Sequence, residues 1–378
     1  MIIRVLSLPK DSWQLHFPAY FCTMHVDHLI IGQGICGTFL SWYLEKANRS
    51  FIVIDENKVN SPSRIAAGII NPVTGRRMVK TWMIDDVMPF ALTAYHELGI
   101  ELNLDAIEQK NIIDFFPTPQ MKLSFQQRHT EDPQYLSIPT EQSKWKEYFN
   151  DDFGFGEINP CLLVNIAGIL AAYRLRLQTK LREENFELKL LKVDKETIQY
   201  KDITATSIIF CDGTSSVNNP YFSLLPFAPN KGEVLWIECK GLPATNIFKS
   251  GINLVPWKEN IFWVGSSYEW EFQDQLPSES FREKTISHLD RWLKIPFDVI
   301  DHKASIRPAT LERRPFIGFH PTHKNLGIFN GMGTKGCSLA PFFAARFVDY
   351  ILNGVPLLPD INIFRFKNIL TKHNQQIG

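Results

Sequence analysis

A glycine-rich turn between a buried strand and a helix limits the folds open to this chain. Residues 28–31 predict the strand, and residues 37–46 predict the helix. The turn between them reads Gly32-Gln33-Gly34-Ile35-Cys36-Gly37. The first glycine permits a tight turn, the second lets a pyrophosphate approach the backbone, and the third lets the helix pack closely on the strand. Because the helix N-terminus adds free N–H groups and partial positive charge, this segment predicts a dinucleotide-binding βαβ unit.

An acidic residue completes this unit at the end of the next strand. Residues 51–54 predict a second buried strand, and Asp55 follows it. A carboxylate here accepts hydrogen bonds from both ribose hydroxyls and disfavours a 2′-phosphate, since two anions would meet. The pattern does not separate FAD from NAD. An NAD-dependent dehydrogenase and a non-catalytic nucleotide-binding module therefore stay open on these residues alone.

The order of predicted elements indicates two domains in an α/β protein of 378 residues. Strand–helix segments occur at both ends and once in the middle, including a long helix at 165–184, a last strand at 326–329 and a last helix at 336–352. Between them, strands 252–256 and 261–265 predict a hairpin. We expect a discontinuous Rossmann-type domain, formed by residues 24–98, 161–220 and 301–378, with an antiparallel-sheet substrate domain inserted as 99–160 and 221–300. Residues 1–23 are expected to be an extension outside both.

Composition narrows the class of protein further. Forty basic and forty acidic residues give zero net charge, which disfavours a dedicated nucleic-acid binder. Six scattered cysteines without a C-x-x-C are typical of reduced, buried thiols in a cytoplasmic protein. We expect no membrane span, because charged residues interrupt the most apolar stretch, 339–358. His320 and His323 have H-x-x-H spacing but lie beside a proline in a loop, so we predict no metal site.

Four segments, in order over about residues 26–352, resemble the D-amino-acid oxidase-like FAD-dependent oxidoreductases. They are HLIIGQGICG…FIVID, SPSRIAAGIINP, ATSIIFCDGTSS and SIRPATLERRPFIGFHP…NLGIFNGMGTKGCSLAP. That family includes glycine oxidase, sarcosine oxidase and the oxidoreductase domain of the bifunctional tRNA wobble-uridine-modifying enzyme. Two departures occur: Ser305 stands where the family has glycine before x-R-P, and Cys211-Asp212-Gly213 replaces A-x-G.

The resemblance implies an FAD site built from several turns. Backbone groups near small residues would contact the flavin and its phosphates, and a glycine-rich helix N-terminus would stabilise the anionic pyrimidine end of reduced flavin. The implied cofactor-binding residues are Gly32, Gly34, Ile35, Cys36, Gly37, Asp55, Ser63, Arg64, Ala66, Ala67, Gly68, Val193, Gly213, Gly331, Met332, Gly333, Thr334, Lys335 and Gly336. Arg64 can instead be a solvated loop residue, and Val193 a plain core valine. Relatives with covalent flavin carry a cysteine close to the position of Ser305. None of the six cysteines of this chain falls there, so we expect non-covalent FAD.

The resemblance also implies a reaction and two catalytic residues. Arg307, the arginine of x-R-P, would bind a substrate carboxylate with its two-pronged guanidinium; the alternative is a structural pair with Glu312. Lys335 would add positive charge beside the flavin. The implied reaction is hydride transfer to flavin from the C–N bond of an amino acid or N-substituted glycine, with dioxygen or another acceptor reoxidising the flavin. The same chemistry on a tRNA wobble uridine is possible but not favoured.

Overall fold

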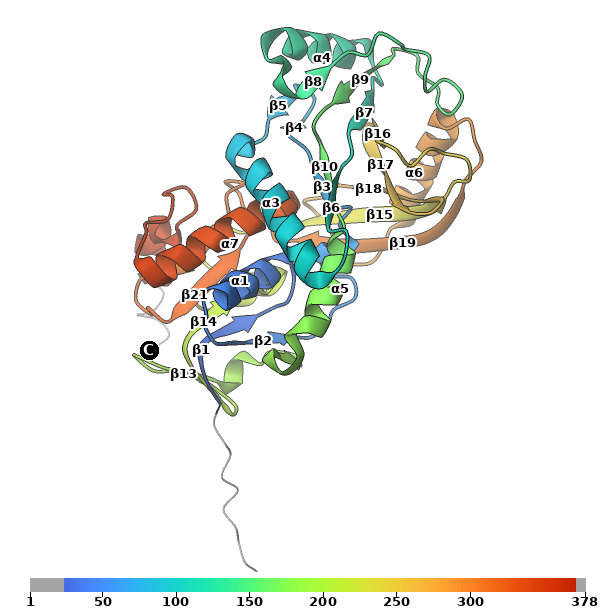
Figure 1. Ribbon diagram of the computed structural model, residues 1–378. Coiled ribbons are helices and arrows are strands. Elements are labelled where there is room, and N and C mark those ends of the chain that lie inside the picture. Colours follow the sequence, from blue (N-terminus) through green and yellow to red (C-terminus); the bar gives the residue numbers. More distant parts are fainter. Residues whose placement is uncertain (1–23, 372–378) are drawn as a thin grey trace, which may run out of the picture.

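The computed structural model describes residues 24–371 and contains two large sheets (Figure 1). The extension expected at residues 1–23 lies outside the described residues. No helix within residues 24–371 is long and apolar enough to cross a membrane.

Five parallel strands form the centre of the first sheet, as expected for a Rossmann-type domain. In spatial order these are β11 (Leu181–Glu183), β2 (Phe51–Asp55), β1 (Met24–Ile31), β14 (Ile203–Phe210) and β21 (Leu326–Asn330). Three antiparallel strands complete it, namely β12 (Leu191–Val193), β13 (Ile198–Tyr200) and β20 (Phe316–Phe319). Because parallel strands end at the same edge, the turns after β1, β2, β14 and β21 lie side by side.

Each face of this sheet has its own apolar core, because side chains alternate along a strand. Ile30 and Val53 join the core under the helices, whereas Leu29 and Ile52 join the core on the opposite face. The helices that contribute to the first core are α1 (Ile35–Lys46), α3 (Ile84–Leu102), α5 (Ile166–Leu177) and α7 (Gly336–Asn353). Figure 1 shows these helices together on one side of the sheet. Burial on both faces explains why the strands read as continuous apolar runs.

The second sheet is mostly antiparallel, and its side chains form most of a third apolar core. Its order is β19 (Asp298–Arg307), β15 (Asn230–Glu238), β18 (Ile261–Gly265), β17 (Ile252–Lys258), β16 (Ile247–Ser250), β7 (Ile112–Phe115), β9 (Phe155–Ile158) and β8 (Leu136–Ser137). The helices beside it are α4 (Pro119–Glu131) and α6 (Glu279–Trp292). The shorter elements are α2 (Pro62–Ile65), β3 (Ile69–Ile70), β4 (Val73–Thr74), β5 (Val79–Lys80), β6 (Ile107–Gln109) and β10 (Leu162–Val164). The predicted hairpin of strands 252–256 and 261–265 is β17–β18.

One prediction about a single element was wrong. The long helix expected at 165–184 begins as predicted, with Asn165 capping it, but it ends at Leu177 because Gln178 has φ 47°. Residues 181–183 then form β11 beside β2. In addition, the boundary expected between residues 300 and 301 falls inside β19, whose whole length pairs with β15. The division into two domains otherwise stays a proposal.

Candidate functional site

One elongated cavity of about 460 Å³ runs from the carboxyl ends of the parallel strands into the second sheet. Most of the residues expected to bind cofactor or substrate line it. They are Gly32, Gly34, Ile35, Cys36, Asp55, Ser63, Arg64, Ala66, Ala67, Gly68, Gly213, Arg307, Met332, Gly333, Thr334 and Gly336. Gly34 and Gly333, which belong to separate turns far apart in sequence, therefore share one channel.

The turn after β1 has the close packing that a phosphate loop requires. Gly32 has φ 99°, and a Cβ there would lie 2.6 Å from the Cys211 carbonyl oxygen. A Cβ on Gly37 would lie 1.8 Å from the Gly32 carbonyl oxygen, so helix α1 can meet this turn only through glycine. A Cβ on Gly34 would meet only the Ser63 hydroxyl, at 3.2 Å. The backbone of Gly34 is thus the surface left open to an approaching anion.

Asp55 is fixed by three donors at the end of β2. Its carboxylate accepts hydrogen bonds from the backbone N–H groups of Gln33 at 2.8 Å and Asn57 at 2.9 Å. Arg174 of α5 pairs with it at 2.7 Å and with Glu183 at 2.8 Å. The two carboxylates and one guanidinium leave a net negative charge here, which suits ribose hydroxyls better than a further phosphate. Sequence reasoning missed Arg174, since nothing in α5 indicates that this side chain points toward the turn.

The segment after β2 wraps around the cavity through α2. Trp263 of β18 donates its indole N–H to the Ile65 carbonyl oxygen at 2.8 Å, which ties this segment to the second sheet. A Cβ on Gly68 would lie 2.0 Å from the Val164 carbonyl oxygen. Ser305, which replaces the family glycine, donates its hydroxyl to the Asn60 carbonyl oxygen at 2.7 Å. The departure at residue 305 therefore holds the same segment in place.

The turn after β21 leads through a single 3₁₀ turn, Gly333–Lys335, into α7. Gly331 and Gly333 have φ of 80° and 56°, a region that favours glycine. Lys335 does not line the cavity. Burial, together with the charges of Arg314 and Arg313, lowers the pKa of its ammonium group. The positive charge expected from Lys335 at the flavin thus has no support from its position.

Three other expected cofactor residues also lie outside the cavity lining, namely Gly37, Gly331 and Val193. The two glycines act through the shape of their turns. Val193 is in β12, where it packs against the core on the face of the sheet opposite α1 and α7. Residues 184–186, a few positions before Val193, line the cavity instead. One carboxylate oxygen of Glu184 is buried without a hydrogen-bond partner among the described residues. The prediction for Val193 came from the resemblance to the family alone.

Asp212 is a further cavity residue that the sequence did not single out. Burial raises the pKa of its carboxyl to about 7, even though Ser216 donates a hydrogen bond to it. The Asn330 amide is 3.4 Å from the same carboxylate. Near neutral pH this carboxyl is therefore protonated in part of the molecules, which makes it a hydrogen-bond donor as well as an acceptor in the cavity.

Arg307 brings an uncompensated positive charge to the far end of the cavity. Its guanidinium donates to the Asn230 side-chain oxygen at 2.8 Å, the Ser267 carbonyl oxygen at 3.2 Å and the Ser266 hydroxyl at 2.7 Å. All these partners are neutral, and burial lowers the pKa of Arg307. The alternative pairing with Glu312 is wrong, because Glu312 pairs with Arg365 at 3.2 Å. No carboxylate within residues 24–371 forms an ion pair with Arg307, so an anionic ligand can supply one.

Comparison with known proteins decides between the cofactors that the fingerprint left open. The family model described as "FAD dependent oxidoreductase" matches residues 27–350. The chain belongs to this family. It is therefore an FAD-dependent oxidoreductase, and its cavity fits that cofactor: the glycine turn after β1, the Asp55 carboxylate and the glycine turn after β21 line one channel. The resemblance stated from the sequence is confirmed.

Individual relatives agree with the family. Glycine oxidase of Bacillus subtilis is 26% identical over 358 residues, which cover 87% of this chain and 94% of the relative. A crystal structure of glycine oxidase from Geobacillus kaustophilus has a TM-score of 0.74 at 17% identity, covering 89% of this chain and 96% of that one. Iminodiacetate oxidase from Chelativorans sp. BNC1 has a TM-score of 0.71 at 18% identity, covering 88% and 98%. These solved structures share the fold of this chain, and the family matched is that of FAD-dependent oxidoreductases.

Gly232 of β15 gives a first test of how Arg307 is held. A Cβ on Gly232 would lie 1.8 Å from a guanidinium nitrogen of Arg307. We expect Gly232→Ala to displace this side chain and raise KM for an amino acid by about 10-fold or more, because charge-assisted hydrogen bonds depend strongly on geometry. Steady-state kinetics of the FAD-loaded protein measure this.

A double-mutant cycle is the control for this prediction. If Gly232→Ala acts only through Arg307, it adds nothing in an Arg307→Met background. Equal effects of Gly232→Ala in both backgrounds would show that it disturbs the site by another route.

Proposed function

We propose that this enzyme oxidises the C–N bond of an amino acid or N-substituted glycine. The observation that carries the proposal is the half-buried Arg307 guanidinium, which has only neutral partners among residues 24–371 and lies in the cavity that holds the expected cofactor turns. A substrate carboxylate is the ligand that best satisfies such a fork. The full-length similarity to a glycine oxidase supports the same substrate class.

The residues of the chain would divide the work along the cavity. Gly34 and the N-terminus of α1 would face the pyrophosphate, Asp55 the ribose, and the 331–336 turn the flavin pyrimidine. FAD bound there supplies the hydride acceptor and passes the electrons to dioxygen or another acceptor. Arg307 would hold the substrate carboxylate and so aim the α-carbon along the channel. The side-chain nitrogen of Asn230, buried without an acceptor among the described residues, would give a second donor beside Arg307.

Non-covalent attachment of FAD and a cytoplasmic location belong to the same proposal. Burial raises the pKa of the Cys36 and Cys337 thiols, which line the cavity, to about 12. Protonated thiols are poor nucleophiles, which supports a non-covalent flavin. Five buried free cysteines support a reducing compartment. Acid precipitation of the holoenzyme tests the attachment, since all the yellow colour should remain in the supernatant.

An anaerobic titration tests the proposed reaction. The purified protein should show a flavin spectrum, and one of glycine, sarcosine, proline and D-alanine should bleach it by donating a hydride. Each turnover in air should release one imine-derived carbonyl product. A holoenzyme that none of the four bleaches, at concentrations up to tens of millimolar, would contradict the proposed substrate class while leaving FAD binding intact.

A further inference from the structure

The loop between β18 and α6, residues 266–278, forms one wall of the substrate site. Ser266 and Gln275 line the cofactor cavity. The Ser266 hydroxyl and the Ser267 carbonyl oxygen both accept hydrogen bonds from Arg307. The ring of Tyr268 lies 5.7 Å from the guanidinium carbon. The position of this loop therefore determines the position of Arg307.

The first half of the loop runs beside β15 as an additional extended segment. Lys231 and Glu269 exchange two backbone hydrogen bonds, at 2.9 and 3.0 Å. The backbone N–H of Glu233 donates to the Ser267 hydroxyl at 2.9 Å, and the Ser267 N–H donates to the Glu233 carbonyl oxygen at 3.1 Å. Since Gly232 lies against Arg307, the side chains of Lys231 and Glu233 point to the opposite face of the strand.

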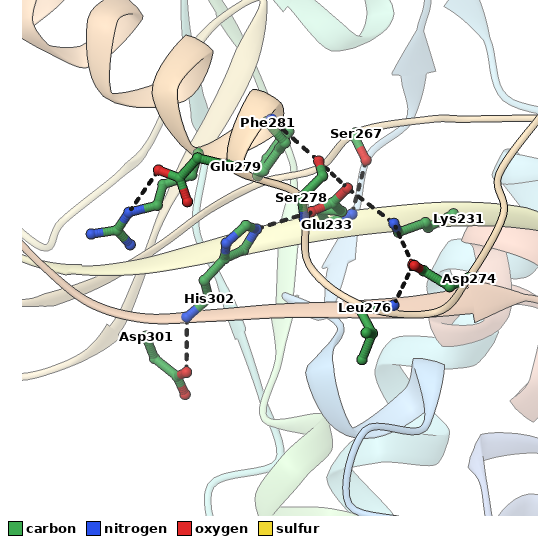
Figure 2. Close-up of polar contacts among 11 residues, drawn as sticks. Lys231, Glu233, Ser267, Asp274, Leu276, Ser278, Glu279, Phe281, Asp301 and His302 are labelled. Carbon is green, nitrogen blue, oxygen red and sulfur yellow. Dashed lines mark hydrogen bonds and ion pairs between the residues drawn. The ribbon is translucent and has the colours of Figure 1, made fainter.

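These two buried side chains also hold the second half of the loop (Figure 2). The Glu233 carboxylate is fully buried and accepts from the Ser278 backbone N–H at 2.6 Å and the Ser278 hydroxyl at 2.8 Å. The Lys231 ammonium lies 3.4 Å from Glu233 and 3.7 Å from Asp274. One pair of residues on β15 thus fixes both ends of the loop.

His302 extends this cluster to the neighbouring strand β19. Its Nε2 is 3.0 Å from a Glu233 carboxylate oxygen, as Figure 2 shows, and its ring lies 5.7 Å from that of Phe281 on α6. Lys231, Glu233 and His302, which we name the anchor cluster, therefore connect β15, β19, the loop and the first turn of α6. A carboxylate removed from water in this way needs its donors, so the cluster strongly favours one arrangement.

Little apolar packing holds the loop from outside. A second hollow of about 610 Å³ lies between the loop and α6, and Ser267, Glu269 and Ser278 line its loop side. The side chains of Tyr268 and Trp270 are 47% and 48% exposed. Polar contacts with the anchor cluster are therefore the main restraint on the loop.

We propose that the anchor cluster holds loop 266–278 against the substrate site, and that Glu233 is a positioning residue for Arg307. Glu233 does not line the cofactor cavity; it acts through Ser267 and Ser278. The part of this inference that concerns substrate affinity rests on the proposed function of Arg307, whereas the part that concerns loop position does not.

The first test measures the loop directly in the FAD-loaded, full-length protein. Chymotrypsin cleaves after aromatic residues, and the loop offers Tyr268, Trp270 and Phe272. We expect Glu233→Gln to raise the cleavage rate within 266–278 by about 10-fold or more, because the opened loop becomes more populated. Glu238→Gln, the same change at the half-buried end of the same strand, should leave the rate unchanged. Mass spectrometry locates the cuts.

The second test separates positioning from a general structural role. We expect Glu233→Gln to raise KM for the substrate, and Kd for the non-reacting carboxylate benzoate, by about 10-fold while kcat changes less than about 3-fold. Asp274→Asn, at an exposed loop position, should raise the KM for the substrate and the Kd for benzoate by about 2-fold each, as expected for a partly exposed ion pair. Benzoate binding is followed by the flavin spectrum.

A wild-type cleavage rate and benzoate Kd in folded Glu233→Gln protein would overturn the inference, even if its thermal stability fell. If Glu233→Gln does not fold, the cleavage rate and the benzoate Kd are measured in Asp274→Asn. Wild-type values of both would then overturn the inference. If no amino acid bleaches the flavin, the proposed function fails, but the cleavage rates still decide whether the anchor cluster holds the loop.

Discussion

Replacing Arg307 by methionine should lower kcat/KM for an amino acid by about 10³-fold, the largest kinetic effect expected of any substitution in the substrate half of the cavity. Methionine preserves bulk but removes both the charge and the fork that would meet the carboxylate. Arg307→Lys should recover only part of the loss, because an ammonium cannot make two parallel bonds. Steady-state kinetics and the flavin absorbance of each variant give the measurement.

The FAD content should stay at the wild-type level in both Arg307 variants, because the proposal gives Arg307 a contact with the substrate carboxylate and none with FAD. Arg128→Met is the matched control, since Arg128 lies on α4 and pairs with Glu131 at 3.1 Å, away from the residues that line the cavity. A KM within about 2-fold of wild type in Arg307→Met would remove Arg307 from the carboxylate site, given that a buried charged contact is worth far more than this.

The parallel part of the fold could be predicted because its signals are local. The strand at 28–31, the glycine turn and Asp55 follow one another in sequence, and each has a single physical explanation. The end of α5 could not be predicted, because 165–184 keeps good helix formers on both sides of Gln178. Tertiary pairing of Leu181–Glu183 with β2 decides the conformation of this segment.

The sequence identified single residues of the cavity but not the partners that surround them. Arg307 was found from the residues around it, but its partners Asn230 and Ser266 lie on other segments of the second sheet and loop. Asn230 meets Arg307 only through the pairing register of β15 with β19, and Ser266 only through the loop that follows β18, neither of which a sequence shows. The other end of the cavity has the same difficulty: Phe186 lines it and Val193 does not, although both belong to one short stretch of the sequence.

Alanine at Gly34 and alanine at Gly37 should affect FAD binding for different physical reasons. In Gly37→Ala the new Cβ would overlap the Gly32 carbonyl oxygen at 1.8 Å, so the protein itself must distort. We expect this variant to lose bound FAD. We also expect the thermal midpoint of the apoprotein to fall by several degrees, because each kcal/mol of destabilisation lowers the midpoint of a protein of this size by about 2 °C. Flavin absorbance after gel filtration and thermal unfolding of the apoprotein measure the two effects.

Gly34→Ala should separate these effects, because its Cβ meets only the Ser63 side chain, with the hydroxyl at 3.2 Å, and its φ of −79° suits alanine. The apoprotein should keep its thermal midpoint, whereas the Kd for FAD should rise by about 100-fold, because the methyl group occupies the space where a pyrophosphate approaches the backbone. A Gly34→Ala protein that binds FAD as tightly as wild type would show that the phosphates lie elsewhere. The turn after β1 would then shape the fold without holding the cofactor, and the channel from Gly34 to Gly333 would need another occupant.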